Sequence, residues 1–337
     1  MADFDEAIAR DSNLAVAFSN RCIAWTNQGE PDNAIKDANV AIQLDPTLAH
    51  AYNNRAVALI HKGEPDLAIE DCEQAISLAP NLADGYGNRA AAYIQKMMFQ
   101  QALVDAHAAI KINPRNNFAY EIRGNALMNL GYFKEALVDF DRVLKHVPDA
   151  PFVLSGRGLA RHRLGQYPQA LADYDEAIRL WNDNPGSAVI YNNRGYAYHA
   201  MGRFKEAAAD YERAMQLEAD HPNAYKNYAW LLATCPEDTF REGQRAIKLA
   251  TKAHELTNWQ NTAWFHILAA AYAEASQFEQ ATHWQQKAIE AAAEEERSVE
   301  QERLKLYEAG QVIRDVATVD HHAICSSRSR SLRPRSG

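Results

Sequence analysis

Residues 49–82, AHAYNNRAVALIHKGEPDLAIEDCEQAISLAPNL, decide the fold. In each half of this stretch, small and apolar residues recur three and four positions apart, and each set marks one face of a helix. The inner-facing residues are Tyr52, Arg55, Ala56 and Leu59 in the first half and Ala68, Asp71, Cys72 and Ala75 in the second. Gly63 ends the first helix, Pro65 begins the second, and Pro80 follows its end. The stretch therefore predicts a hairpin of two helices.

The same pattern recurs along the chain with a step of 34 residues. Three ladders of equivalent residues share this step. They are Ala34, Ala68, Ala102, Ala136 and Ala170; Pro46, Pro80, Pro114 and Pro148; and Phe18, Tyr52, Tyr86 and Tyr120. A fixed period of this length indicates a repeat array, and chance does not produce three coincident ladders. Val, Ile and Thr are too sparse for an extended sheet, so the sequence predicts an all-α chain.

The repeated positions resemble the tetratricopeptide repeat family. The units at 117–150 and 188–221 match its pattern of aromatic, small and apolar residues best. The matching residues are Tyr120, Gly124, Leu127, Ala136, Phe140 and Pro148 in the first and Tyr191, Gly195, Tyr198, Ala207, Tyr211 and Ala214 in the second. The resemblance covers residues 4–292, and the C-terminal portion is similar to a group of bacterial tetratricopeptide proteins. It implies a right-handed superhelical solenoid of stacked helix-turn-helix hairpins.

The repeat pattern divides the chain into four parts. Residues 1–14 match the second helix of an earlier repeat, so the chain as given begins inside a repeat. Eight units are then expected at 15–48, 49–82, 83–116, 117–150, 151–187, 188–221, 222–261 and 262–292. A charged helix at 293–310 is expected to cover the last apolar face, because a solenoid needs a polar cap. The basic stretch 311–337 has few hydrophobic residues and is expected to be disordered.

Composition and charge indicate which class of partner and which cellular compartment to expect. The net charge of −9 argues against a nucleic-acid binder, because phosphate affinity needs a basic stripe. The cysteines, Cys22, Cys72, Cys235 and Cys325, show no CxxC spacing and indicate reduced thiols. No apolar run approaches the ~18 residues of a membrane span, and the first residues do not resemble a signal peptide. The chain as given is expected in the cytoplasm, and an upstream signal stays open because the chain begins within a repeat.

A second pair of ladders carries charge. Arg21, Arg55, Arg89, Arg123, Arg157 and Arg194 take the same place in the first helix of six units, and Asp37, Asp71, Asp105, Asp139, Asp173 and Asp210 match them in the second helix. Both are absent from the seventh and eighth units, where Tyr228 and Leu268 stand at the Arg position. Joint loss indicates a pair, and a buried Arg requires a carboxylate. The sequence predicts six partly buried ion pairs that fix helix register, with a charged ligand site as the alternative.

Residues one step around from the packing face are expected to line a groove on the first helices. In the middle and later units these are aromatic, basic and polar: Phe118, Glu121, Asn125, Phe152, Leu159, His162, Arg163, Asn192, Tyr196, His199, Lys226 and Trp230. Rings and cations of this kind are typical of a surface that binds peptides. The alternative is that Leu159, Tyr196 and Trp230 pack between neighbouring units.

One known way of binding peptides is not expected here. Some tetratricopeptide proteins grip a C-terminal carboxylate of chaperone tails with a Lys and an Asn one turn apart. Lys226 stands where that Lys would be, but Trp230 replaces the Asn, and no other unit supplies the Lys.

Catalytic and metal sites have little support in the sequence. His321, His322 and Cys325 are close enough together to suggest a metal, but they lie in the basic stretch. No nucleotide-binding or nucleophile motif is present, so no cofactor, small-molecule substrate or catalysis is expected.

We therefore predict a non-catalytic scaffold or adaptor that binds a peptide or helix of another protein in the groove. The alternative is the regulatory repeat region of a larger or exported multi-domain protein or enzyme. Weak RNA contact through the Arg- and Ser-rich tail is a third reading.

Overall fold

The computed structural model describes residues 1–182 and 184–315. Over these residues the chain is helical and contains no β-strand, which confirms the all-α prediction. It forms two compact units, Met1–Pro148 and a second that begins at Asp149. No helix in this described part of the chain is both long and apolar enough to cross a lipid bilayer.

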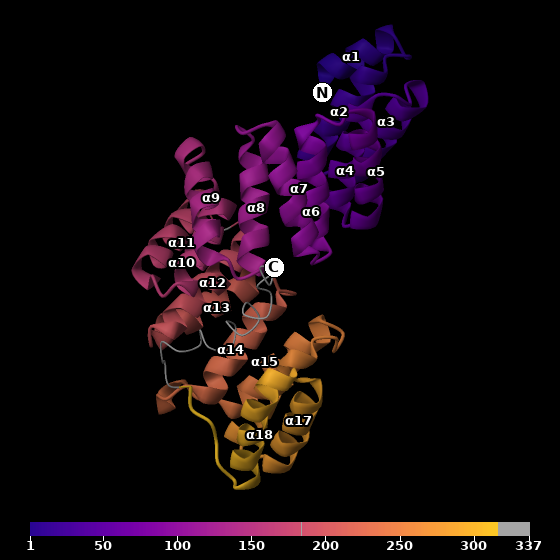
Figure 1. Ribbon diagram of the computed structural model, residues 1–337. Helices are drawn as coiled ribbons and strands as arrows, with labels where there is room; N and C mark the ends of the chain where they lie inside the picture. The colour runs from indigo at the N-terminus through magenta and orange to yellow at the C-terminus, as the bar shows by residue number, and fades with distance from the viewer. Residues whose placement is uncertain (183, 316–337) are drawn as a thin grey trace, which may run out of the picture. The chain divides into compact units, whose positions relative to one another are not determined.

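The first unit is a row of helical hairpins (Figure 1). Its helices are α1 (Ala2–Arg10), α2 (Ala15–Asn27), α3 (Pro31–Leu44), α4 (Ala49–Lys62), α5 (Pro65–Leu78), α6 (Ala83–Gln95), α7 (Phe99–Ile112), α8 (Asn117–Asn129) and α9 (Phe133–His146). Each even-numbered helix packs against the odd-numbered helix that follows it and against the next even-numbered helix. We call α2 to α16, even numbers only, the leading helices. They form one layer of the unit, and the odd-numbered helices form the other.

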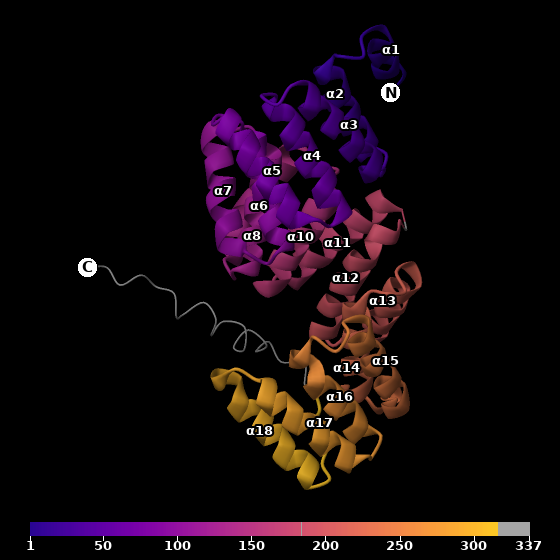
Figure 2. The ribbon, with the colours of Figure 1, turned by 90° about the vertical axis from the view of Figure 1, so that its right-hand side faces the viewer.

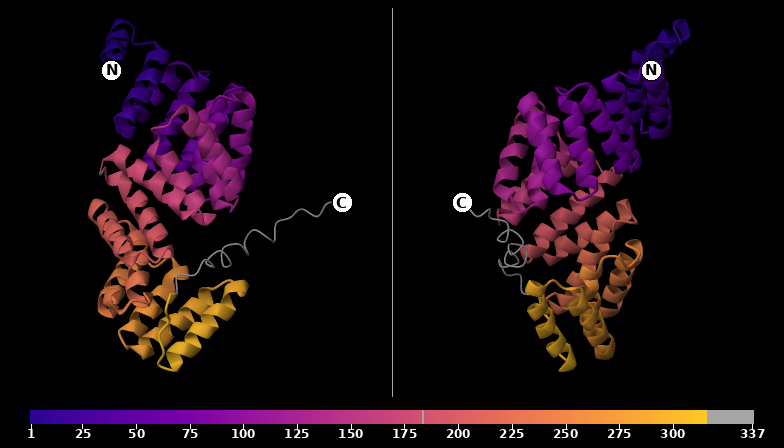
Figure 3. Two further views of the ribbon diagram at one scale, coloured as in Figure 1. Left: turned by 90° about the vertical axis from the view of Figure 1, so that its left-hand side faces the viewer. Right: turned by 45° about the vertical axis from the view of Figure 1, so that its right-hand side comes forward.

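The second unit has the same arrangement (Figure 2). Its elements are α10 (Pro151–Arg163), α11 (Tyr167–Trp181), η1 (Pro185–Ser187), α12 (Ala188–Ala200), α13 (Phe204–Leu217), α14 (Pro222–Thr234), η2 (Asp238–Phe240), α15 (Gly243–Leu256), η3 (Thr262–Trp264), α16 (Phe265–Glu274), α17 (Phe278–Ala291) and α18 (Glu294–Glu308). Helix α18 packs on α17 at the end of this unit, as two further views show (Figure 3).

Small residues set the distance between the two layers. The alanines of the 34-residue ladder have no exposed surface: Ala34, Ala68, Ala102, Ala136 and Ala170. A residue without a long side chain lets two helix backbones approach closely, which fills the core at the density of other protein interiors.

A second small position changes with the residue that faces it. Gly124 lies against the ring of Phe140, and a Cβ added there would be 2.7 Å from Cε1 of that ring. The preceding repeat has the opposite combination, because Ala90 stands at the position of Gly124 and faces the smaller Ala106. Side-chain volume lost on the leading helix is thus offset by volume gained on the following helix.

The turn that ends each leading helix of the first unit needs a residue with positive φ. Gly29, Gly63 and Gly131 supply it, but the third repeat places Met97 there at φ 58°. A side chain in this region costs roughly 1–2 kcal/mol of folding free energy. Glycine removes this strain, but its greater conformational entropy in the unfolded state offsets part of the gain. We expect Met97→Gly to raise the free energy of unfolding by about 0.5–1 kcal/mol in urea denaturation.

The matched control is Met201→Gly. Met201 also follows a leading helix and is exposed, but its φ is −89°, so glycine removes no strain there. This control should lose stability or leave it unchanged. A lower unfolding free energy for Met97→Gly would contradict the strain argument.

The end of the described chain corrects one prediction. Disorder was expected from residue 311, but residues 311–315 run back from the end of α18 to α14 as an extended segment (Figure 1). Val312 and Ile313 pack into apolar clusters of the second unit, which a composition-based reading of the basic stretch cannot detect. The rest of the predicted tail lies outside the described residues.

Candidate functional site

The structure brings each ladder arginine to its matching aspartate, at nitrogen to oxygen distances of 2.6–2.7 Å. The pairs are Arg21–Asp37, Arg55–Asp71, Arg89–Asp105, Arg123–Asp139, Arg157–Asp173 and Arg194–Asp210. In the Arg89 pair, Nε and Nη2 each donate to a different carboxylate oxygen of Asp105. The aspartate side chains are at most 10% exposed, so the two parallel bonds replace their lost hydration.

An aromatic residue three positions earlier supports most of these arginines. The guanidinium carbon lies 5.2–5.7 Å from the ring centroid of the preceding aromatic. These combinations are Phe18–Arg21, Tyr52–Arg55, Tyr86–Arg89, Tyr120–Arg123 and Tyr191–Arg194. The ladder charges are therefore satisfied within each hairpin, and the surface that could receive a partner must be sought elsewhere.

Three of the predicted groove residues belong to the first unit, on α8. Phe118 is 40% exposed, and its ring lies over Gly87 of the neighbouring leading helix. Burial raises the pKa of the Glu121 carboxyl above its ordinary value. Asn125 is half-buried on the same helix. These side chains offer one exposed ring and no cation.

The second unit groups aromatic and basic side chains on α10 and α12. The His162 and Tyr196 rings stack with centroids 4.7 Å apart and planes within 9°. The Arg163 guanidinium carbon lies 5.9 Å from the centroid of the same Tyr196 ring. Tyr196 therefore packs between neighbouring repeats of the second unit, and one part of its ring faces a cation.

A second cation lies on the next leading helix. The Lys226 ammonium is 5.2 Å from the centroid of the Trp264 ring. Burial, and to a smaller extent the positive charge of Arg163, lowers the pKa of Lys226 to about 8. Within residues 1–182 and 184–315, neither Arg163 nor Lys226 has an acidic side chain in salt-bridge range. This arrangement leaves local positive charge that an anionic group would stabilise.

The remaining predicted groove residues differ in access. Three are at most 6% exposed: His162, Asn192 and His199. Phe152 is 59% exposed and contacts Trp181 edge to face, whereas Leu159 is half-buried. The three buried side chains can shape the surface but present little area to a partner, and the assignment of the whole set to a groove stays a prediction.

Asparagine pairs between leading helices were not predicted. Asn88 donates to Asn53 at 2.9 Å in the first unit, and Asn227 donates to Asn192 at 2.9 Å in the second. Both pairs are separated by 35 residues, one more than the repeat. That spacing is the sequence signal that could have revealed them, because it joins equivalent faces of adjacent leading helices.

Trp230 contacts the extended segment at the end of the described chain. Its indole Nε1 donates to Asp315 Oδ2 at 2.5 Å, and His199 Nε2 lies 3.6 Å from the same oxygen. The backbone amide of Asp315 donates to the Thr234 carbonyl at 2.8 Å. A carboxylate that is 11% exposed is thus held by groups from α12 and α14.

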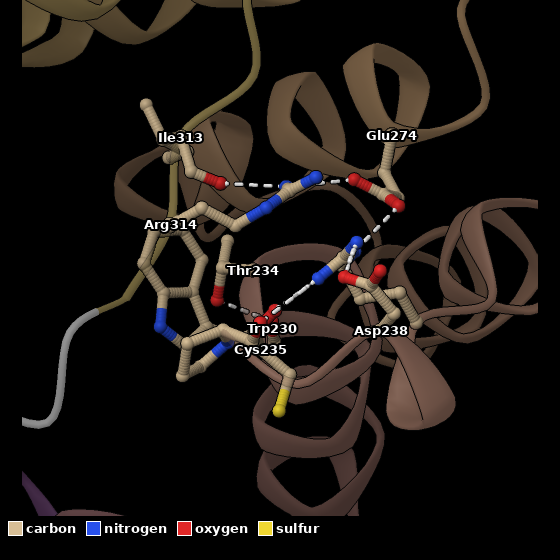
Figure 4. Close-up of polar contacts among 9 residues, drawn as sticks. Trp230, Thr234, Cys235, Asp238, Glu274, Ile313 and Arg314 are labelled. Atoms are coloured by element: carbon tan, nitrogen blue, oxygen red, sulfur yellow. Dashed lines mark hydrogen bonds and ion pairs between the residues drawn. The ribbon is translucent and has the colours of Figure 1, made fainter.

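The neighbouring Arg314 has its own acceptor. Its Nη1 donates to Glu274 Oε2 at 2.8 Å. Figure 4 draws this contact. Glu274 also accepts from Arg241 Nε at 3.0 Å, and Arg241 in turn binds Asp238 and the Cys235 carbonyl. Asp238 and Cys235 lie in the connection between α14 and α15, so this connection helps to orient the acceptor for Arg314.

The metal ligands that the sequence suggests, His321, His322 and Cys325, lie outside the described residues. In the part of the chain that the structure describes, no group of three or more His, Cys, Asp or Glu side chains is placed to hold a metal ion.

Comparison with known proteins agrees with this geometry. Residues 149–220 and residues 49–82 match family models described as tetratricopeptide repeat. No curated protein sequence matches the chain significantly. The fold is similar to a solved structure of the APC/C hetero-tetramer Cut9–Hcn1, with a TM-score of 0.69 and 14% identity over 80% of this chain and 51% of that chain. The chain therefore spans about half the length of that relative.

A second solved structure, PilF of Pseudomonas aeruginosa, is similar with a TM-score of 0.52 and 18% identity. The match covers 66% of this chain and 99% of that one. At these identities the likeness shows a shared fold of stacked helical hairpins.

Proposed function

Because this chain is a tetratricopeptide repeat protein, we propose that it binds an extended acidic segment of a partner protein. The repeat fold generally serves as a scaffold for protein interaction. The proposed surface lies on the leading helices of the second unit, around Arg163, Tyr196 and Lys226. The chain acts as a non-catalytic adaptor, whose contribution is to hold the partner.

The two cations without acidic neighbours carry this proposal. The arginines of the interior ladder each have an aspartate, but Arg163 and Lys226 have no such partner among the described residues. The lowered pKa of Lys226 means that its charged form is destabilised in the free protein. A carboxylate brought by a partner would relieve this cost, so acidic segments are selected over neutral or basic ones.

Aromatic side chains add contact area next to these charges. The Tyr196 ring lies beside Arg163, and the Trp264 ring lies beside Lys226. Rings that are already held by neighbours lose little entropy when a partner covers them, and such residues dominate the binding energy of many interfaces. Together they provide apolar contact beside each cation.

Affinity purification with mass spectrometry tests the proposal. We expect Arg163→Glu to reduce recovery of the specific partner by roughly tenfold or more, because like charges across an interface cost several kcal/mol. Lys226→Met keeps the aliphatic stem and removes the charge, and it should weaken capture of the same partner.

Arg179→Glu is the matched control. Arg179 lies on α11, outside the leading layer, and its side chain is 66% exposed beside Glu176. This reversal changes the net charge by the same amount and should leave recovery intact. Undiminished capture by the Arg163→Glu protein would refute the assigned surface, provided that circular dichroism shows both variants folded.

A further inference from the structure

The end of the described chain packs on the leading helices of the second unit. After α18, Gly310 turns the backbone at φ 67°, and residues 311–315 run antiparallel to the helix toward α14 (Figure 1). The last three residues of this segment are aliphatic, cationic and acidic in succession: Ile313, Arg314 and Asp315. Each of the three side chains contacts a group of matching chemistry on the second unit.

The aliphatic contact comes first. Ile313 packs against two apolar clusters, one containing Tyr228 and Leu231 and the other containing Tyr307. Arg314 donates to Glu274 (Figure 4). Arg241 donates to the other oxygen of the same carboxylate. The Arg314 side chain remains 30% exposed, so the ion pair lies at the edge of the surface. A partner cation can reach that edge from solvent.

The acidic contact is the most buried. Asp315 Oδ2 accepts a hydrogen bond from Trp230 Nε1 at 2.5 Å and lies 3.6 Å from His199 Nε2. The amide of Asp315 donates to the Thr234 carbonyl. Thr234 is the last residue of α14, and carbonyl groups at a helix C-terminus lack N–H donors within the helix. Any extended backbone can donate to it, so the backbone contact is independent of sequence and the side chains provide selection.

We propose that α12, α14 and α16 form a binding site for an extended segment with an aliphatic, a cationic and an acidic residue in succession, and that residues 313–315 are its resident occupant, exchanged for a partner segment of the same pattern. The inference rests on the proposed function, because the incoming segment belongs to a partner protein. It adds the residue pattern of the ligand and a control on access to the surface.

The energetics of a tethered ligand predict how exchange behaves. A segment joined to α18 by a short connection is present at an effective concentration of roughly millimolar, so it occupies the site even if its intrinsic affinity is modest. A free segment must then compete, and its apparent affinity falls by the fraction of chains in which the site is open. Releasing the resident segment should restore the intrinsic affinity.

A peptide with the sequence of residues 311–315, acetylated, amidated and fluorescently labelled, measures this effect by anisotropy. We expect it to bind the full chain carrying Ile313→Gly and Asp315→Gly at least about tenfold more tightly than the wild-type chain. Within the peptide, Asp315→Asn should weaken binding to the released chain by at least about tenfold, because the charge-assisted hydrogen bond from Trp230 is lost. Trp230→Phe in the released chain should weaken binding similarly.

Two controls separate release from damage. Glu308→Ala removes a carboxylate from the exposed end of α18 and should leave peptide affinity at the wild-type value. If the double variant loses helicity, Asp315→Asn alone, which leaves Ile313 in place, makes the same comparison. Hydrogen exchange at the Asp315 amide should be protected in the wild-type chain.

Equal peptide affinity for the wild-type and released chains would overturn the inference, as would peptide binding that ignores the Asp315→Asn change. These outcomes are distinct from failure of the proposed function, which is read from partner capture by the Arg163→Glu protein. Capture that persists there, together with tighter peptide binding after release, would reject the Arg163 surface and retain this site.

Discussion

Asp105→Ala is expected to lower the free energy of unfolding by about 3–5 kcal/mol, because it leaves the Arg89 guanidinium partly buried without its carboxylate. The Asp105 side chain is 6% exposed, and Arg89 makes two hydrogen bonds to it at 2.6 and 2.8 Å. Those bonds raise the pKa of Arg89. A guanidinium stays protonated even without such bonds, so the arginine keeps its charge when the partner is removed. Urea denaturation followed by circular dichroism measures the loss.

Glu135→Ala is the control for this prediction. Glu135 is exposed on α9 of the same unit, and its removal should change stability by no more than about 0.5 kcal/mol. A double variant, Arg89→Met with Asp105→Leu, should recover most of the loss, because it removes both charges and keeps the volume. Equal small losses for Asp105→Ala and Glu135→Ala would show that the pair is not buried in solution.

Phe140→Ala is expected to lower the free energy of unfolding by about 3–5 kcal/mol, because the ring has no exposed surface and leaves a cavity beside Gly124. Gly124→Ala alone should cost about 1–3 kcal/mol, since the added Cβ would be 2.7 Å from the ring. Combined, the two changes reproduce Ala90 and Ala106 of the preceding unit, where both residues are fully buried.

The double variant should therefore be more stable than the sum of the single losses predicts, by at least about 1 kcal/mol, because the new methyl group fills part of the cavity. The double-mutant cycle is measured by denaturant unfolding of all four proteins. Strict additivity would mean that the glycine and the ring do not share one packing space, and the proposed exchange of volume between layers would be wrong.

The helical hairpins could be predicted from the sequence because their cause is local. Periodicity of three and four residues identifies the packing face of each helix, and glycine or proline marks the ends, as at Gly63 and Pro65. The 34-residue step then pairs equivalent positions, so Arg89 and Asp105 could be matched before any distance was known. Both members lie within one hairpin, 16 residues apart.

The exposure and the neighbours of the surface residues could not be predicted in the same way. Helical spacing places His162 and His199 on the leading face, but it does not report which neighbours cover them, and both are at most 6% exposed. It likewise could not show that Arg163 and Lys226 lack acidic neighbours, because that depends on several helices at once. The exposure and charge balance of a face are set by packing between repeats, which periodicity does not describe.

Sequence alone determined the all-helical repeat and the pairing of its interior charges, because a repeat contacts mainly itself and its neighbours. Only the tertiary structure shows that residues 311–315, the first part of the basic stretch, pack on the second unit and contact α14. The bond from Trp230 to Asp315 spans 85 residues and obeys no repeat spacing. Its physical basis is the meeting of an indole donor, a helix-terminal carbonyl and a carboxylate, which only the folded chain brings together.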